Sequence, residues 1–169
     1  YTQYNKLNEL DVFSSLKLIE GTQGQVWSFR KIDGRLFCAH TNGLLEILPD
    51  FRIRHPYRVN TGVFRTLEAT INGKQIQIII TYDNLLILNR TTGELNSMRQ
   101  ISDPIYNAEV DHLGNIWLET ASRGVYKCRL NDEQNAFRYY TYYGNEKDSS
   151  LPARLQLFKS GGRILFLGN

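Results

Sequence analysis

Five residues with ligand-binding chemistry lie in three short loops of the chain. The loops are residues 41–42, 82–83 and 121–123, and each one follows an apolar stretch. Amide, hydroxyl and aromatic groups beside an arginine suit the hydroxyls of a carbohydrate and the carboxylate of a uronate. We therefore predict a ligand-binding surface formed by Asn42, Tyr82, Asp83, Ser122 and Arg123. Arg123 is the most specific of them, because it is a long hydrogen-bond donor that suits a carboxylate.

The remaining reactive side chains do not form a pattern that indicates catalysis. The three histidines have no metal-like spacing with one another or with the two cysteines. Four aspartates stand beside turn residues, where they stabilise the backbone, and no two carboxylates are paired as in a glycosidase. Motifs for a nucleophile elbow, a phosphate-binding loop or a zinc protease are missing from the sequence. We predict no catalytic residue, no metal ligand and no cofactor.

The segments that position these loops have the pattern of short β-strands. Strand-like runs alternate with Gly, Asn, Asp and Pro about every ten residues, which is typical of an all-β protein. Four turn glycines can be superposed, and each is followed three residues later by a large apolar side chain. The glycines are Gly34, Gly73, Gly114 and Gly162, and the apolar residues are Phe37, Ile76, Trp117 and Leu165. A further landmark follows at Gly43, Asn84 and Gly124.

These landmarks repeat with a period of about 40 residues, the length of one β-propeller blade. Each repeat predicts a strand before the turn glycine, two after it and a more variable outer strand. The fold class is therefore all-β, with four-stranded antiparallel blades in a fragment of a larger, seven-bladed propeller. The predicted blades are residues 1–25 (partial), 26–61, 62–103, 104–152 and 153–169 (partial).

The phase of the repeat predicts that the sequence starts and ends within a blade. Residues 14–21, "SSLKLIEG", have the pattern of an outer strand of a preceding blade. A closed four-bladed ring is the alternative, and residues 1–12 argue against it because they lack a Gly-led strand.

The stretch "DHLGNIWLETASRGVYKCRL" resembles the two-component regulator propeller repeat. The consensus of that repeat runs Asp, turn Gly, apolar, Trp, apolar, Gly, Thr, then Gly-Leu and an aromatic. Glu119 and Arg123 depart from it at positions where glycine is common. The matching residues are Asp111, Gly114, Asn115, Ile116, Trp117, Thr120, Gly124, Val125 and Tyr126.

The resemblance implies a non-catalytic segment of a hybrid two-component sensor of the kind found in gut Bacteroidetes. Such a segment would lie in the periplasm, sense an oligosaccharide and relay a signal to a histidine kinase outside this chain. Its partners would be the ligand and the neighbouring blades and domains, with a homodimer left open. The alternative is a protein-interaction scaffold with no small ligand.

Other features were weighed against ordinary packing. Trp117 and Trp27 are interpreted as core residues, and Cys38 and Cys128 as buried free thiols. The tract "FRYYTYYG" places tyrosines on both faces of one outer strand, which makes Tyr139, Tyr140 and Tyr142 candidates for an interface. The net charge is +3 with scattered basic residues, which predicts no nucleic-acid binding, and no apolar run has the length of a membrane span.

Overall fold

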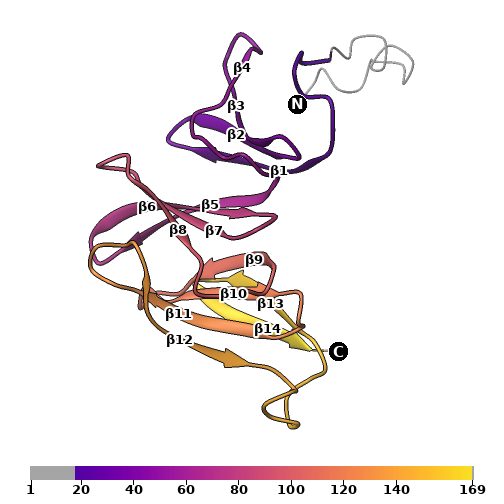
Figure 1. The fold of residues 1–169 in the computed structure, drawn as a ribbon, viewed down its shortest axis with the longest axis vertical. Helices are drawn as coiled ribbons and strands as arrows, with labels where there is room; N and C mark the ends of the chain where they lie inside the picture. Colours follow the sequence, from indigo (N-terminus) through magenta and orange to yellow (C-terminus); the bar gives the residue numbers. More distant parts are fainter. Residues whose placement is uncertain (1–17, 169) are drawn as a thin grey trace.

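The computed structural model describes residues 18–168, which form four antiparallel sheets (Figure 1). The first sheet contains β1 (Val26–Ile32), β2 (Arg35–His40), β3 (Gly43–Ile47) and β4 (Ile53–Arg54). The second contains β5 (Val63–Ile71), β6 (Lys74–Thr81), β7 (Leu85–Asn89) and β8 (Leu95–Met98). The third contains β9 (Ile105–Val110), β10 (Ile116–Thr120), β11 (Val125–Leu130) and β12 (Phe137–Tyr143). The fourth contains β13 (Leu155–Ser160) and β14 (Arg163–Gly168).

Within each sheet every strand pairs with the next strand along the chain, and the sheets follow one another in sequence order (Figure 1). The first strands of successive sheets, β1, β5, β9 and β13, pack against one another, whereas no comparably extensive packing joins the outer strands of the described residues. The sheets therefore converge at their first strands and spread apart outward, as the blades of a propeller do. The expected all-β blade architecture is confirmed.

The core lies between the sheets, where alternate side chains of neighbouring strands interdigitate. The largest cluster joins the second and third sheets and contains Ile78, Ile80, Leu118 and Cys128. A second cluster joins the first and second sheets, and a third joins the third and fourth. Trp117 packs against this third cluster, which confirms its interpretation as a residue between two sheets. A single sheet cannot bury both of its faces without neighbours, so the stability of each sheet depends on the sheets beside it.

The predicted turn glycines have one common conformation. Gly34, Gly73, Gly114 and Gly162 all have φ between 74° and 78°, in the left-handed region that favours glycine. In the third sheet Asp111 accepts hydrogen bonds from the backbone of Leu113 and Asn115 and from Trp117 Nε1, at 2.8 to 3.0 Å. The Asp of the repeat therefore fixes both the turn and the tryptophan.

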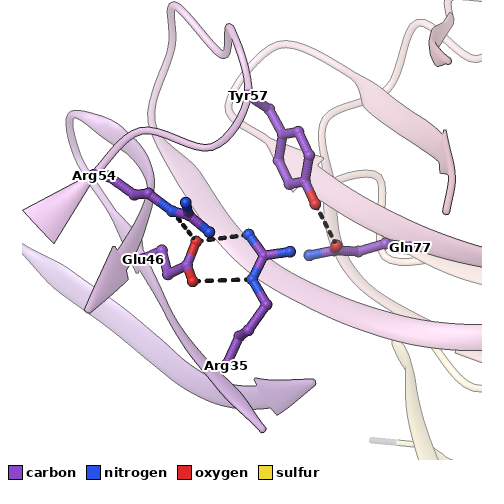
Figure 2. A network of polar contacts seen from close by, with 5 residues as sticks. All are labelled: Arg35, Glu46, Arg54, Tyr57 and Gln77. Atoms are coloured by element: carbon purple, nitrogen blue, oxygen red, sulfur yellow. Dashed lines mark hydrogen bonds and ion pairs between the residues drawn. The ribbon is translucent and has the colours of Figure 1, made fainter. Parts of the chain in front are cut away.

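The outer strand of the first sheet is short. Only Ile53–Arg54 pairs with β3, because Pro56 lacks the N–H that a longer ladder needs. The carboxylate of Glu46 joins Arg54 to Arg35 across this end of the sheet, as Figure 2 shows. Beside them, the Tyr57 hydroxyl donates to Gln77 Oε1 at 3.4 Å and links the connecting segment to the second sheet.

Two further predictions concern a strand near the start of the sequence and a membrane span. Most of the outer strand predicted at residues 14–21 lies outside the described residues, and residues 18–21 form coil and a turn rather than a strand. Between residues 18 and 168 no helix has the length and hydropathy of a membrane span.

Candidate ligand-binding site at the inner strands

The first strands of three sheets carry an irregularity at the same position. In β1, Val26 pairs with His40 and Ser28 with Ala39, so that Trp27 is an extra, unpaired residue. Phe64 is the extra residue of β5, and Tyr106 is that of β9. Each is the second residue of its strand, and each is aromatic. A β-bulge redirects the side chain of the extra residue away from the regular alternation of the strand.

The three bulged side chains lie side by side across the sheets. The ring centroids of Trp27 and Phe64 are 5.1 Å apart, and those of Phe64 and Tyr106 are 5.6 Å apart. Tyr82, from the loop after β6, lies 4.5 Å from Phe64, and its hydroxyl accepts a 2.6 Å hydrogen bond from Trp27 Nε1. We call these four residues the aromatic row.

The aromatic row is partly open to solvent. Trp27 is 42% exposed and Tyr106 is 47% exposed, whereas Phe64 and Tyr82 are half-buried. The interpretation of Trp27 as a core residue is therefore wrong. Its position in a bulge at the inner edge of the sheet turns the indole out of the regular packing pattern. A ligand can reach the two outer members of the row.

The loops that we predicted to bind ligand lie at the same end of the sheets as the aromatic row. The residue before each first strand accepts a backbone hydrogen bond from the corresponding loop, at 2.9 to 3.0 Å. The acceptors are Gln25, Gly62 and Pro104, and the donors are Thr41, Tyr82 and Ala121. In each of the first three sheets, the loop after the second strand is therefore hydrogen-bonded to the residue that precedes the first strand.

Glycine at position 62 is what lets Tyr82 enter the row. A Cβ on Gly62 would come within 2.4 Å of the Tyr82 ring. Thr81 holds the same loop, because its hydroxyl accepts from the backbone of Asn84 at 3.0 Å. This hydrogen bond stabilises the turn that follows β6.

The structure places the five predicted site residues in different surroundings. Tyr82 belongs to the aromatic row, with Asp83 exposed beside it. Asn42 is fixed by a backbone hydrogen bond to His40 Nδ1 at 3.0 Å and lines a separate surface cavity of about 590 Å³. Ser122 donates to Asp103 Oδ2 at 2.9 Å in a third location.

Arg123 is exposed and adopts a conformation that is unfavourable for its residue type. Its φ is 67°, in the left-handed region, and its carbonyl accepts a hydrogen bond from Leu155 N at 2.9 Å. The backbone therefore behaves like the glycine usual in the repeat, and the cost of keeping a side chain there is about 1 kcal/mol.

Of the four residues of the aromatic row, only Tyr82 is among the site residues predicted from the sequence, and Trp27, Phe64 and Tyr106 are not. A signal was present, because "VWSFRKI", "VFRTLEATI" and "IYNAEV" all have an aromatic residue in second place. Aromatic residues are common in buried strands, so the pattern alone does not separate a site from packing. The bulges show which of these aromatic residues are displaced from the regular alternation of their strands.

Residues 18–168 contain no group of three or more His, Cys, Asp or Glu side chains arranged to hold a metal ion. Both cysteines are buried and free. Burial raises the pKa of Cys38, and it raises the pKa of Cys128 to about 12. The exposed rings of Trp27 and Tyr106 offer faces on which a ligand can stack.

Comparison with known proteins identifies the architecture through structure rather than sequence. No protein-family model matches the chain, and no curated protein matches it. Among solved structures, the extracellular domain assigned to one-component system BT4673 of B. thetaiotaomicron has a TM-score of 0.63 at 14% identity. The extracellular domain assigned to hybrid two-component system BT3049 of the same organism has a TM-score of 0.58 at 22% identity. The catalytically inactive H270A virginiamycin B lyase of Staphylococcus aureus, solved with quinupristin, has a TM-score of 0.57 at 14% identity.

The chain is a run of β-propeller blades. The matches cover 85%, 84% and 91% of the chain, and they correspond to 19%, 19% and 52% of the other proteins. The chain thus spans about a fifth of the length of the two extracellular domains. The resemblance that we expected from the Trp117 repeat is confirmed in fold, because extracellular domains of hybrid two-component systems contain blades like these.

Proposed function

We propose that these blades are a non-catalytic, ligand-recognising part of an extracytoplasmic sensor, and that the ligand is an oligosaccharide. The sensor would belong to a hybrid two-component protein whose histidine kinase lies outside this chain and whose sensing region lies in the periplasm. The fold shared with extracellular domains of such systems supports the sensor role. The aromatic row supports the choice of ligand.

The row suits a sugar chain because of its shape and polarity. The C–H face of a pyranose stacks on the negatively charged face of an aromatic ring, and exposed Trp and Tyr provide such faces with little loss of side-chain entropy. Trp27 and Tyr106 stand on different sheets, with Phe64 between them. A ligand of at least two sugar units can therefore contact both ends of the row.

Binding across the row also provides a route to a signal. The hydrogen bond from Trp27 to Tyr82 joins the first sheet to the second, and Phe64 joins the second to the third. A ligand that touches both ends changes the free energy of the contacts between blades. Differential binding to two blade arrangements is what a sensor needs in order to shift an equilibrium.

Tryptophan fluorescence of the purified protein tests the proposal. The chain has two tryptophans, so Trp117→Phe leaves Trp27 as the reporter. We expect saturable changes in Trp27 emission with at least one member of a panel of gluco-, manno-, galacto- and xylo-oligosaccharides and their uronate-containing counterparts.

Matched variants locate the binding. In the Trp117→Phe background, Tyr106→Ala should weaken binding at least about tenfold, because exposed aromatics dominate such contacts. Tyr139→Ala removes a tyrosine of similar exposure, 49%, from an outer strand and should leave binding unchanged. A panel without any binder, or equal losses in the two variants, would contradict the proposal and favour a protein-interaction scaffold.

A further inference from the structure

A cavity that shares no residue with the aromatic row lies beside β11 and β12 of the third sheet. Its volume is about 450 Å³, and three tyrosines line it. Tyr126 of β11 lies between the other two, with ring centroids 4.9 Å from Tyr142 and 6.1 Å from Tyr140. Tyr126 pairs with Tyr142 across the two strands, and Tyr140 is two residues before Tyr142 in β12, so all three rings share one face of the sheet. We call this cavity the tyrosine pocket.

Tyr139, the third of the predicted interface residues, does not belong to the pocket. It pairs with Arg129, one position out of phase with Tyr140, and therefore points to the opposite face of the sheet. Of the three candidate interface residues, two line the pocket and Tyr139 lies outside it.

The tyrosine pocket is held rigidly by its surroundings. Tyr142 lies against the backbone of two glycines, because a Cβ on Gly124 or Gly144 would come within 2.2 or 2.5 Å of its hydroxyl oxygen. The hydroxyl of Tyr126 donates to Asp103 Oδ2 at 3.4 Å. Burial first, and the carboxylate of Asp103 next, raise the pKa of Tyr126, so its hydroxyl remains a donor at neutral pH.

Charged groups give the pocket a preference between ligands. Asp103 and Glu146 line it with carboxylates, and Lys147 contributes one ammonium. Lys147 Nζ lies 5.7 Å from the centroid of the Tyr142 ring, within the range of a cation–π contact. The chain's own cation therefore already occupies one aromatic face, while two carboxylates leave the lining with an excess of negative charge.

We propose that the tyrosine pocket binds an organic ammonium cation. Three adjoining aromatic rings with a carboxylate beside them are the groups that recognise quaternary ammonium and alkyl-ammonium ions through cation–π contacts. The cation takes the place of Lys147 against the rings, and Asp103 supplies the opposite charge. This inference does not rest on the oligosaccharide proposal, because none of its residues belongs to the aromatic row.

A pair of isosteric probes tests the charge requirement. Choline and 3,3-dimethyl-1-butanol have the same shape, but only choline carries a charge. With the purified protein, titrations followed by NMR of the tyrosine rings should show saturable choline binding at millimolar concentration. The neutral alcohol should bind about tenfold more weakly, the range expected for a partly desolvated cation–π site. Equal binding of the two probes would overturn the proposal.

Three variants test whether choline binding depends on the charges that line the pocket or only on its apolar surface. Asp103→Asn retains an oxygen for Ser122 and Tyr126 but loses the charge, and it should weaken choline binding about fivefold. Lys147→Met removes the competing cation and should strengthen binding by a similar factor. Tyr139→Leu, on the opposite face, should have no effect. Unchanged choline affinity in both charge variants, with cooperative melting showing that they are folded, would refute the proposal.

A further comparison identifies the source of the cation. Nα-acetyl-lysine methylamide presents the side chain of a partner polypeptide, whereas choline represents a free small molecule. Tighter binding of the lysine derivative assigns the pocket to a protein partner, and tighter binding of choline assigns it to a metabolite. Failure of both probes contradicts the inference while leaving the aromatic row and its ligand unaffected.

Discussion

Glu46 supplies the most quantitative test of how the first sheet is held together. Its side chain is 4% exposed, and its two oxygens accept from Arg35 Nε at 2.9 Å and Arg35 Nη2 at 2.6 Å, with Arg54 Nε at 2.6 Å (Figure 2). The hydrogen bonds from Arg35 lower the pKa of Glu46 to about 2 against the opposing effect of burial, with Arg54 adding to the decrease.

The difference between the folded and unfolded pKa of Glu46 corresponds to a contribution to the free energy of unfolding. A decrease from 4.5 to about 2 corresponds to about 3 kcal/mol of stabilisation by the ionised carboxylate. The two arginine side chains are 40% and 54% exposed, so water screens part of the interaction. We therefore expect Glu46→Gln to lower the free energy of unfolding by about 2 kcal/mol at neutral pH.

The pH dependence has a definite sign. Because the pKa is lowered in the folded state, the contribution is complete above the unfolded pKa near 4.5 and is lost as the pH falls toward about 2. Urea unfolding of the wild type and Glu46→Gln should differ by the full amount at neutral pH and by less than half of it at about pH 3.

A control and a refuting result complete this test. Glu68 is 49% exposed and pairs with Arg90 at 3.2 Å, so Glu68→Gln should change stability by less than about 0.5 kcal/mol. If Glu46→Gln destabilises equally at neutral pH and about pH 3, the loss comes from packing and not from charge, and the reasoning is wrong.

Three other perturbations have clear expected outcomes. Gly62→Ala should push Tyr82 out of the aromatic row, red-shift the Trp27 emission in the Trp117→Phe background and weaken oligosaccharide binding; an unchanged spectrum would show that the loop adapts. Arg123→Gly should raise the melting temperature by a few degrees, since about 1 kcal/mol of backbone strain is relieved. If this variant also binds uronate-containing oligosaccharides like the wild type, Arg123 is not a ligand-binding residue. Cys38 and Cys128 should react with Ellman's reagent only after unfolding, because burial raises the pKa of both thiols; rapid reaction of the folded protein would contradict their placement.

The strands and turns were predictable because they depend on local chemistry. Each turn glycine marks a left-handed residue that other amino acids adopt only with strain, and the apolar residue three positions later marks the buried strand. The two-faced character of the tyrosine tract was also predictable, since side chains alternate along any strand.

The site was predictable only in part because it depends on register. Trp27 resembles a core residue in sequence, and only the pairing of Val26 with His40 and of Ser28 with Ala39 reveals that it is displaced. Similarly, Asn42 and Ser122 occupy equivalent loops, yet one lines a cavity beside the first sheet and the other contacts Asp103. These differences arise from contacts between sheets, which a single repeat does not encode.

The repeated bulge leaves one side chain in each of three blades outside the regular strand pairing. An extra residue in a strand has no partner across the ladder, so its identity can change without altering the pairing on either side. Trp, Phe and Tyr already occupy the three equivalent positions. Affinity for a new ligand can therefore be selected one blade at a time, by exchange of single side chains, while the sheets that carry them remain as they are.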